Sequence, residues 1–209
     1  MLKNWDRGVG ESPIQKLADK IHRGPPLKER IAQTVFRLKL QSDKLEQAVN
    51  RLKQHDQQLF EKIVDAAMVK DEARAAIYAN ECAEVRKMIK IILLSQLAIE
   101  QVILRLETIE EFGDVLAQMG PVTGVIHSLK GKLSGIVPEV SYELGQIGEM
   151  LNGMMVEAGV AAGTPSLPEA TSEESKRILQ EAALVAEQRM KEKFPELPDT
   201  YTGESEKHP

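Results

Sequence analysis

Residues 31–66 read IAQTVFRLKLQSDKLEQAVNRLKQHDQQLFEKIVDA. Within them, eleven positions succeed one another in alternating steps of four and three residues, and nine of the eleven are apolar. This spacing places the side chains on one face of a helix, in a stripe that is typical of a coiled coil rather than of a strand. The positions are Ile31, Val35, Leu38, Ser42, Leu45, Val49, Leu52, Asp56, Leu59, Ile63 and Ala66.

A second stripe with the same spacing comes next, but it is shifted by two residues relative to the first. Each stripe belongs to a segment of about 40 residues, so each helix would be about 60 Å long. A phase shift between two arms of matched length predicts a chain reversal and an antiparallel hairpin. Because Lys70 and Asp71 at the expected turn are neither Gly nor Pro, one very long helix is the alternative. The second stripe comprises Ala75, Tyr78, Cys82, Val85, Ile89, Ile92, Gln96, Ile99, Ile103 and Leu106.

The composition agrees with long helices that pack along their sides. Of the 209 residues, 28% are charged and only 4% are aromatic, which is fewer rings than a compact globule of this size usually buries. An ordinary helical globule is the alternative. The single Cys82 excludes an internal disulfide, and the N-terminus lacks the apolar segment of a secretory signal. No uncharged stretch is long enough to span a membrane, so we expect a cytoplasmic protein.

Charge is distributed unevenly along the chain. Residues 1–53 carry twelve Lys and Arg against six Asp and Glu, whereas residues 54–209 carry fifteen against twenty-six. This split predicts an anionic partner for the first part and attraction between the two ends of the chain. Four cations recur every seven residues beside the first apolar stripe, so they share one edge of the helix. We call this set the basic edge: Arg30, Arg37, Lys44 and Arg51.

The basic edge and the N-terminal leader are candidate membrane contacts. Near an anionic membrane each cation contributes about 1 kcal/mol, although a solubilising flank of a coiled coil has the same pattern. In the leader, Leu2, Trp5 and Val9 fall within about 60° of a helix circumference. A Trp ring favours the membrane interface, and the alternative is that Trp5 docks on the protein's own core.

The second arm also carries apolar side chains outside its main stripe. A helix that is apolar on two sides must bury both, either against later segments of the same chain or against another subunit in a polymer. The sequence leaves these two possibilities open. The residues are Met88, Ile91, Ala98, Val102, Ile109 and Phe112.

The later part of the chain predicts shorter helices. Residues 113–153 contain eight glycines, yet their apolar residues keep a helical spacing, and Pro121 and Pro138 each predict a helix start. An interior Gly costs up to about 1 kcal/mol relative to Ala, so the glycines indicate either movable segments or close helix packing. After them, the sequence predicts a linker over residues 157–171 and a last helix over residues 172–193.

Residues 194–209 form a polar tail that begins with a Pro-containing segment. An extended segment of this kind can dock in a groove between helices, or it can simply end the preceding helix. The candidate anchors are Phe194, Pro195, Leu197 and Pro198.

No pattern in the sequence indicates catalysis or a cofactor. The four His residues are scattered, and none has a metal-ligand neighbour three or four residues further along the chain. Gly8 and Gly10 lack the third Gly of a dinucleotide fingerprint, and Ile126 stands where a phosphate loop ending at Lys132 needs a Gly. We therefore expect no enzyme, no cofactor and no metal site. With a net charge of −5, we also expect no nucleic-acid partner.

Several segments resemble the archaeal ESCRT-III proteins, in particular the CdvB paralogues of the archaeal cell-division machinery. The resemblance covers roughly residues 25–195. It is carried by the long basic first helix, by residues 75–81 (AAIYANE) with Val85-Arg86-Lys87, by Leu106-Glu107-Thr108, and by residues 186–198 (AEQRMKEKFPELP).

The resemblance implies an all-α fold with a core over residues 25–156. This core would be a long antiparallel hairpin (about 26–112) with shorter movable helices (about 114–156) packed on it. The helix at 172–193 would fold back on the core in a closed, autoinhibited monomer. Opening would permit polymerisation, alone or with paralogous subunits, on the anionic inner face of the plasma membrane at the division site. The polymer would then constrict and sever the membrane.

The resemblance also implies partners. An AAA ATPase of the CdvC type would grip Phe194, Pro195, Leu197 and Pro198 through its MIT domain, while residues 1–24 with the basic edge would bind membrane. The chain ends before the C-terminal winged helix of CdvB itself, so we expect co-assembly with a longer paralogue. A soluble coiled-coil adaptor that neither polymerises nor binds lipid is the alternative.

Overall fold

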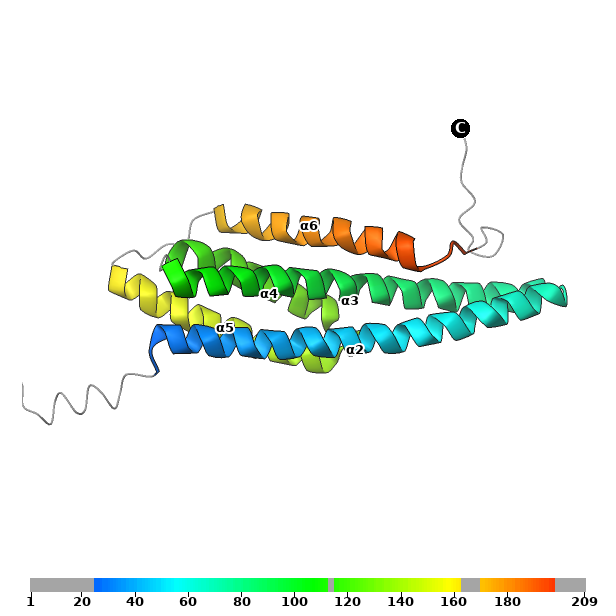
Figure 1. The fold of residues 1–209 in the computed structure, drawn as a ribbon, viewed down its shortest axis with the longest axis horizontal. Helices are drawn as coiled ribbons and strands as arrows, with labels where there is room; N and C mark the ends of the chain where they lie inside the picture. The colour runs from blue at the N-terminus through cyan, green and yellow to red at the C-terminus, as the bar shows by residue number, and fades with distance from the viewer. Residues whose placement is uncertain (1–24, 113–114, 163–169, 198–209) are drawn as a thin grey trace, which may run out of the picture.

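Figure 1 shows a computed structural model of the chain, which describes residues 25–112, 115–162 and 170–197. These residues form five α-helices, so the predicted all-α fold is confirmed. The predicted leader and spacer at 1–24 lie outside the described residues, as does the tail beyond Leu197. The helices are α2 (Leu27–Met68), α3 (Glu72–Phe112), α4 (Val115–Leu133), α5 (Pro138–Ala162) and α6 (Ala170–Lys193).

Helices α2 and α3 form the predicted antiparallel hairpin, side by side along almost their whole length (Figure 1). They contain 42 and 41 residues, so their ends coincide. The two apolar stripes meet in the seam between them, where Leu38, Leu45, Ile92 and Leu106 are fully buried. Each buried Leu or Ile contributes about 1.5–3 kcal/mol, and the seam repeats this contact over about 60 Å.

The chain reverses within three residues without a Gly or a Pro. Lys70 adopts a positive φ of 57°, and the amides of Lys70 and Asp71 donate to the carbonyls of Ala67 and Ala66 at 3.0 and 2.9 Å. These two hydrogen bonds form the Schellman motif that ends α2, with Lys70 in the left-handed position that a Gly usually occupies. The Asp71 carboxylate then accepts a hydrogen bond from the Arg74 amide at 3.0 Å and caps α3. A hairpin is therefore formed rather than one long helix.

Helices α4 and α5 pack on each other and cover the end of the hairpin where α2 begins and α3 ends (Figure 1). Pro138 opens α5 as predicted. The prediction that Pro121 opens a helix is wrong, because α4 begins at Val115 and carries Pro121 inside it. Helix α5 also continues to Ala162, so it occupies the first part of the interval predicted as a linker.

Helix α6 returns along the hairpin and packs on α3 and α4 (Figure 1). It begins two residues before the predicted position and ends at Lys193 as predicted. In Figure 1, α3 lies between α2 and α6, so the first and the last described helices occupy opposite sides of the molecule. Residues 194–197 follow α6 and lie against the hairpin, where Phe194 and Leu197 are partly buried.

The turn provides a test of the hairpin. Lys70→Gly removes the steric cost of a left-handed non-Gly residue, about 1–2 kcal/mol, so we expect an equal or slightly higher unfolding free energy. Lys70→Val puts a β-branched side chain into the same conformation, and we expect a loss of more than about 1 kcal/mol. Urea unfolding measures both variants, and equal stability of the two would contradict this turn.

Candidate functional site

Among the described residues of α6, three apolar side chains are fully buried, and two of them are alanines. Ile178, Ala182 and Ala186 succeed one another at intervals of four residues and are at most 1% exposed. Leu179 and Met190 add partly buried contacts. A buried Ala methyl contributes about 0.8 kcal/mol, less than half of a buried Leu or Ile side chain. Helix α6 is therefore held more weakly than the two arms of the hairpin hold each other.

A glycine in α4 allows α6 to come close. The Ser175 hydroxyl donates a hydrogen bond of 2.9 Å to the Pro121 carbonyl, and its oxygen would lie only 2.5 Å from a Cβ placed on Gly124. Any larger residue at position 124 would push the two helices apart. A Cβ on Gly131, in contrast, meets nothing within 4 Å. Of the two alternatives for the glycines, movable segments or close helix packing, Gly124 therefore shows close packing.

Ion pairs connect α6 to α3. Glu174 accepts a hydrogen bond from Arg105 at 2.6 Å, and Glu187 accepts one from Lys90 at 3.4 Å. Hydrogen bonding from Lys191 and the charge of Lys90 lower the pKa of Glu187. Exposed pairs of this kind stabilise a fold only slightly, and they weaken as salt rises. They fix the orientation of α6 on α3 and contribute little to its binding free energy.

A buried ion pair crosses the hairpin seam below the end of α6. Asp56 stands in the apolar stripe of α2, and its carboxylate accepts hydrogen bonds from Arg86 Nε at 2.6 Å and Cys82 Sγ at 3.0 Å. The side chains of Asp56 and Arg86 are only 6% and 12% exposed. Burial and the hydrogen bond to Asp56 raise the pKa of Cys82 to about 12. The thiol is therefore protonated and donates to the carboxylate.

Arg86 also holds the segment after α6. Its guanidinium lies 5.5 Å from the centre of the Phe194 ring, and it donates a hydrogen bond to the Pro195 carbonyl. A cation over an aromatic face contributes about 0.5–2 kcal/mol, more where water is excluded. Arg86 thus connects both arms of the hairpin to the tail. We call Asp56, Arg86, Phe194 and Pro195 the tail lock.

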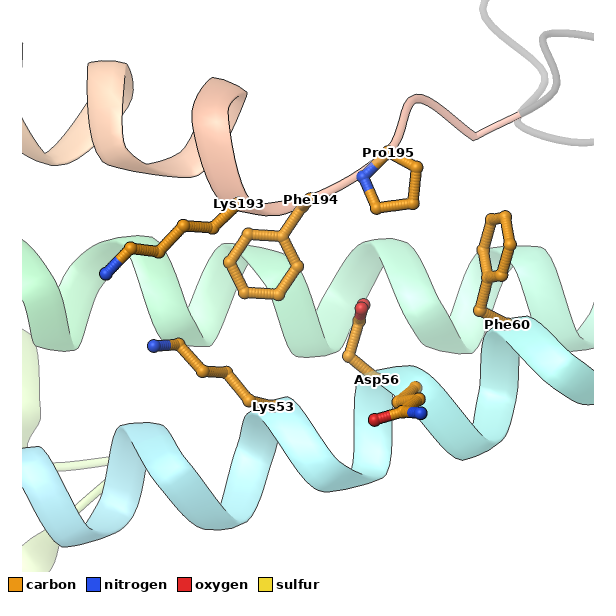
Figure 2. Close-up of a pocket in the computed structure, with 7 residues that line it drawn as sticks. Lys53, Asp56, Phe60, Lys193, Phe194 and Pro195 are labelled. Atoms are coloured by element: carbon orange, nitrogen blue, oxygen red, sulfur yellow. The ribbon is translucent and has the colours of Figure 1, made fainter.

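Figure 2 shows Asp56, Phe194 and Pro195 of the tail lock, with the Phe194 ring turned toward the hairpin. The cavity between the tail and α2 has a volume of about 320 Å³. Burial, and then the nearby charge of Lys193, lower the pKa of Lys53 in this cavity. Lys53, Asp56, Gln57, Phe60, Lys193, Phe194 and Pro195 line it.

The structure thus places the predicted ATPase contacts on the hairpin. Phe194 and Leu197 are partly buried against the core, and Pro195 is exposed. Pro198 lies outside the described residues. In this conformation the core already occupies one face of the segment that was predicted to bind a partner.

The basic edge divides into two halves. Arg30 pairs with Glu157 of α5, and Arg37 donates a hydrogen bond of 2.8 Å to Glu143 of the same helix. Lys44 and Arg51 are exposed and form no ion pair with the described residues. The predicted attraction between the basic first part and the acidic later part is therefore made with α5 and, through Lys39 and Glu107, with α3. Glu174 and Glu187 of α6 pair with α3 instead. Leu2, Trp5 and Val9 lie outside the described residues.

The second apolar face of α3 is covered within the chain. Ala98, Val102 and Ile109 are at most 2% exposed, and Met88 and Ile91 are partly buried against the same core. Helices α4 and α6 supply this cover. Phe112 ends α3, and its side chain is not among those described. A contact between subunits through these residues would require α4 or α6 to move.

Sequence reasoning did not find the roles of Arg86 or Gly124. The signal for Arg86 was indirect: Asp56 is a charged residue in an apolar stripe, and a buried carboxylate needs a cation on the facing helix. For Gly124 the sequence offered no specific signal, because nothing in it distinguishes this glycine from the other seven in residues 113–153. Among the described residues, no three His, Cys, Asp or Glu side chains gather where they could hold a metal ion. None of the described helices is long and apolar enough to cross a membrane.

The fold and the site together define an all-helical hairpin protein that is closed by a helix and a tail from its own C-terminal part. Cell division protein B1 of Sulfolobus acidocaldarius is 49% identical over 173 residues, which cover 83% of this chain and 81% of that protein. Cell division protein B of the same organism is 38% identical over 179 residues, or 86% of this chain and 67% of that protein. The chain belongs to the CdvB family, the archaeal cell-division proteins of the ESCRT-III type. The predicted family is thereby confirmed.

A third protein of that organism, cell division protein B3, is 26% identical over 117 residues, which cover 56% of this chain and 68% of that protein. The three relatives show that one organism contains several paralogous proteins to which this chain is similar. No protein-family model matches the chain, and no solved structure matches it significantly.

The tail lock gives a stability test. Arg86→Met leaves Asp56 buried without its partner, and we expect the unfolding free energy to fall by about 3–5 kcal/mol. The double variant Asp56→Leu/Arg86→Met replaces the ion pair with two apolar side chains, so most of this loss should be recovered. Urea unfolding of the wild type, both single variants and the double variant measures the coupling. Additive losses would show that the two side chains do not interact.

Cys82 gives a chemical test of the same region. Because its pKa is raised from 9.0 to about 12, the folded thiol stays protonated at pH values where an unfolded thiol ionises. We expect a disulfide reagent at pH 8 to react with the native chain at least tenfold more slowly than with the chain in guanidinium. The thiol therefore favours folding below pH 9, and this contribution is lost as the pH rises from 9.0 to about 12. Equal reaction rates would place Cys82 outside the seam.

Proposed function

We propose that this chain is a non-enzymatic subunit of a membrane-remodelling polymer that acts in cell division. It would assemble, alone or with its paralogues, on the inner face of the plasma membrane at the division site and take part in constriction and scission. The observation that carries the proposal is the weak docking of α6 on a strongly packed hairpin. A helix whose fully buried apolar contacts are Ile178, Ala182 and Ala186, with ion pairs near the surface, can leave without unfolding the core.

Release of α6 would uncover surface suited to assembly. The second apolar face of α3, which α4 and α6 cover, includes Ala98 and Val102, and both are fully buried in the closed chain. An apolar face that loses its cover favours association with another chain. If the contact joins two different faces and does not close into a ring, it repeats as a filament. The same sequence would thus have a closed monomer and an open polymer subunit.

The basic edge supports a membrane partner of anionic character. Lys44 and Arg51 form no ion pair among the described residues, and Arg30 and Arg37 are held by single glutamates of α5. Each cation that reaches an anionic surface contributes about 1 kcal/mol. A polymer multiplies this contribution by the number of its subunits, so assembly and membrane binding would reinforce each other. Leu2, Trp5 and Val9 would add an apolar anchor.

The tail supports an ATPase partner. Phe194 and Leu197 would bind the MIT domain of a CdvC-type AAA ATPase, with Pro195 and Pro198 keeping the segment extended. In the closed chain, Phe194 and the Pro195 carbonyl are engaged by Arg86. The ATPase would therefore find its full binding segment on open subunits, which are the ones that a disassembly enzyme needs to select.

A soluble coiled-coil adaptor is the alternative function. The observation that favours it is that the second apolar face of α3 is already satisfied inside the chain. An adaptor would keep α6 docked at all times and would present its outer surface to partners. The two proposals predict different results when α6 is displaced, because only a polymer subunit would then assemble.

Charge placed beneath α6 tests the proposal. In Ala182→Glu a carboxylate replaces a methyl that is 1% exposed, so we expect α6 to detach while the hairpin stays folded. The control Leu184→Glu introduces the same charge on the same helix at a side chain that is 70% exposed. Negative-stain microscopy with anionic vesicles should show filaments or deformed vesicles at about tenfold lower concentration for Ala182→Glu than for wild type and control.

The outcomes separate the two functions. Circular dichroism and hydrogen exchange establish first that the Ala182→Glu chain keeps its hairpin. Bare round vesicles in all samples, with α6 detached in the variant, would contradict a self-sufficient polymer and would favour the adaptor. A wild-type chain that binds no anionic vesicle at any concentration would remove the membrane part of the proposal.

A further inference from the structure

Two large apolar side chains are exposed beside each other on α2. The Phe36 side chain is 62% exposed and Leu40 is 43% exposed, whereas Leu38, which lies between them in the sequence, is fully buried in the seam. They are four residues apart, so they lie one helical turn from each other on the same side. Single exposed apolar residues are common, but an adjacent Phe and Leu on the outer side of a long helix make a patch.

The patch continues into the half of the basic edge that α5 does not pair. At 100° per residue, Leu40 lies about 40° around the helix from Phe36, Arg51 about 60° and Lys44 about 80°. The four side chains therefore share an arc of about 80° over about 22 Å of helix. Asp43 lies about 20° beyond Phe36, on the side away from the two cations. We call Phe36, Leu40, Lys44 and Arg51 the outer face of α2.

The outer face stays accessible while the chain is closed. Leu38, at the centre of the seam, is about 160° around the helix from both Phe36 and Leu40, so α3 packs on the opposite side. Helix α5 reaches Arg30 and Arg37, but the exposed Lys44 and Arg51 lie beyond its ion pairs. Helix α6 is on the far side of α3 (Figure 1). Nothing in the described chain has to move before this face can bind.

We propose that the outer face of α2 is the surface that first docks on an anionic bilayer, with Phe36 and Leu40 inserted among the acyl chains and Lys44 and Arg51 at the headgroups. This inference rests on the membrane part of the proposed function and goes beyond it in two ways. It adds an apolar contribution to a contact that was predicted as purely electrostatic. It also separates the docking cations from Arg30 and Arg37, which α5 occupies in the closed chain.

The charge pattern favours a bilayer over a second copy of the chain. Two apolar side chains and two cations offer much less than the roughly 800 Å² per partner that a stable protein interface buries. A bilayer demands no matching shape. It offers acyl chains to the two apolar side chains of this face and anionic headgroups to its two cations. Long basic side chains can reach headgroups while their neighbours insert more deeply.

A tryptophan reporter tests the insertion. Trp5 is the only Trp, so Trp5→Phe/Phe36→Trp places a single indole on the outer face and keeps the leader aromatic. With phosphatidylglycerol vesicles we expect its emission to shift to the blue and brominated acyl chains to quench it at least twofold. Trp5→Phe/Leu184→Trp, on the exposed side of α6, is the matched control and should show neither effect.

Serine variants separate the apolar and cationic parts. We expect Phe36→Ser/Leu40→Ser to weaken vesicle binding about tenfold or more at both low and high salt, since burial of apolar groups is not screened. Lys44→Ser/Arg51→Ser should weaken it at low salt, with an effect that shrinks as salt rises. All four positions are exposed, and thermal unfolding checks that each variant keeps its fold.

Each outcome decides the inference. Vesicle binding that survives Phe36→Ser/Leu40→Ser, together with an unshifted indole emission from the Phe36→Trp reporter, would overturn it and leave the proposed membrane function standing on other residues. A blue shift that depends on protein concentration and needs no vesicles would assign the face to a second copy and also overturn it. Absence of binding by the wild-type chain itself would instead contradict the proposed membrane function.

Discussion

The seam between α2 and α3 is the contact on which the rest of the molecule depends. It is made of side chains such as Leu38, Leu45 and Ile92, repeated over about 60 Å. Helices α2 and α3 supply both apolar sides of this contact, so the seam does not depend on another helix. This gives the protein a rigid axis. Helices α4 and α5 pack on that axis through fully buried side chains such as Ile126, Leu129 and Leu144. Helix α6 has fewer fully buried apolar groups, a close contact at Gly124 and ion pairs near the surface, so we expect α6 and the tail to be released first.

Charge gives this layered packing its sensitivity to surroundings. Salt weakens the ion pairs between α6 and α3, and another charged partner can replace either side of them. The buried Asp56–Arg86 pair is shielded from solvent. Arg86 belongs to both classes, because it anchors the seam on one side and touches Phe194 on the other. A partner that removed the tail would therefore leave the Asp56–Arg86 contact of the hairpin in place. In the same way, a membrane that attracted the outer face of α2 as proposed would leave the docking of α6 undisturbed, and recruitment and opening would be separate steps.

The sequence predicted the features that depend on periodicity and missed those that depend on contact. Both stripes became the seam, and the last helix was placed to within two residues, because a spacing of three and four has one structural meaning. The turn was uncertain, since Lys70 takes a conformation that usually requires Gly, and Asp71 is a cap that is visible only once α3 is known to start there. The pairing of the basic edge with α5 rather than α6 was not predictable, because net charge does not say which acid meets which base. Phe36 and Leu40 lie outside the stripe, and only their exposure in the folded chain distinguishes them from residues packed elsewhere.

The central claim is that α6 leaves α3 when the chain assembles on a membrane. Spin labels on the exposed positions Glu100 of α3 and Leu184 of α6, in a Cys82→Ala background, report this separation directly by electron–electron dipolar spectroscopy. We expect one short distance for the chain in solution and a longer, broader distribution once anionic vesicles carry filaments. An unchanged short distance on vesicles that are visibly coated and deformed would contradict the account, since the chain would then assemble without opening.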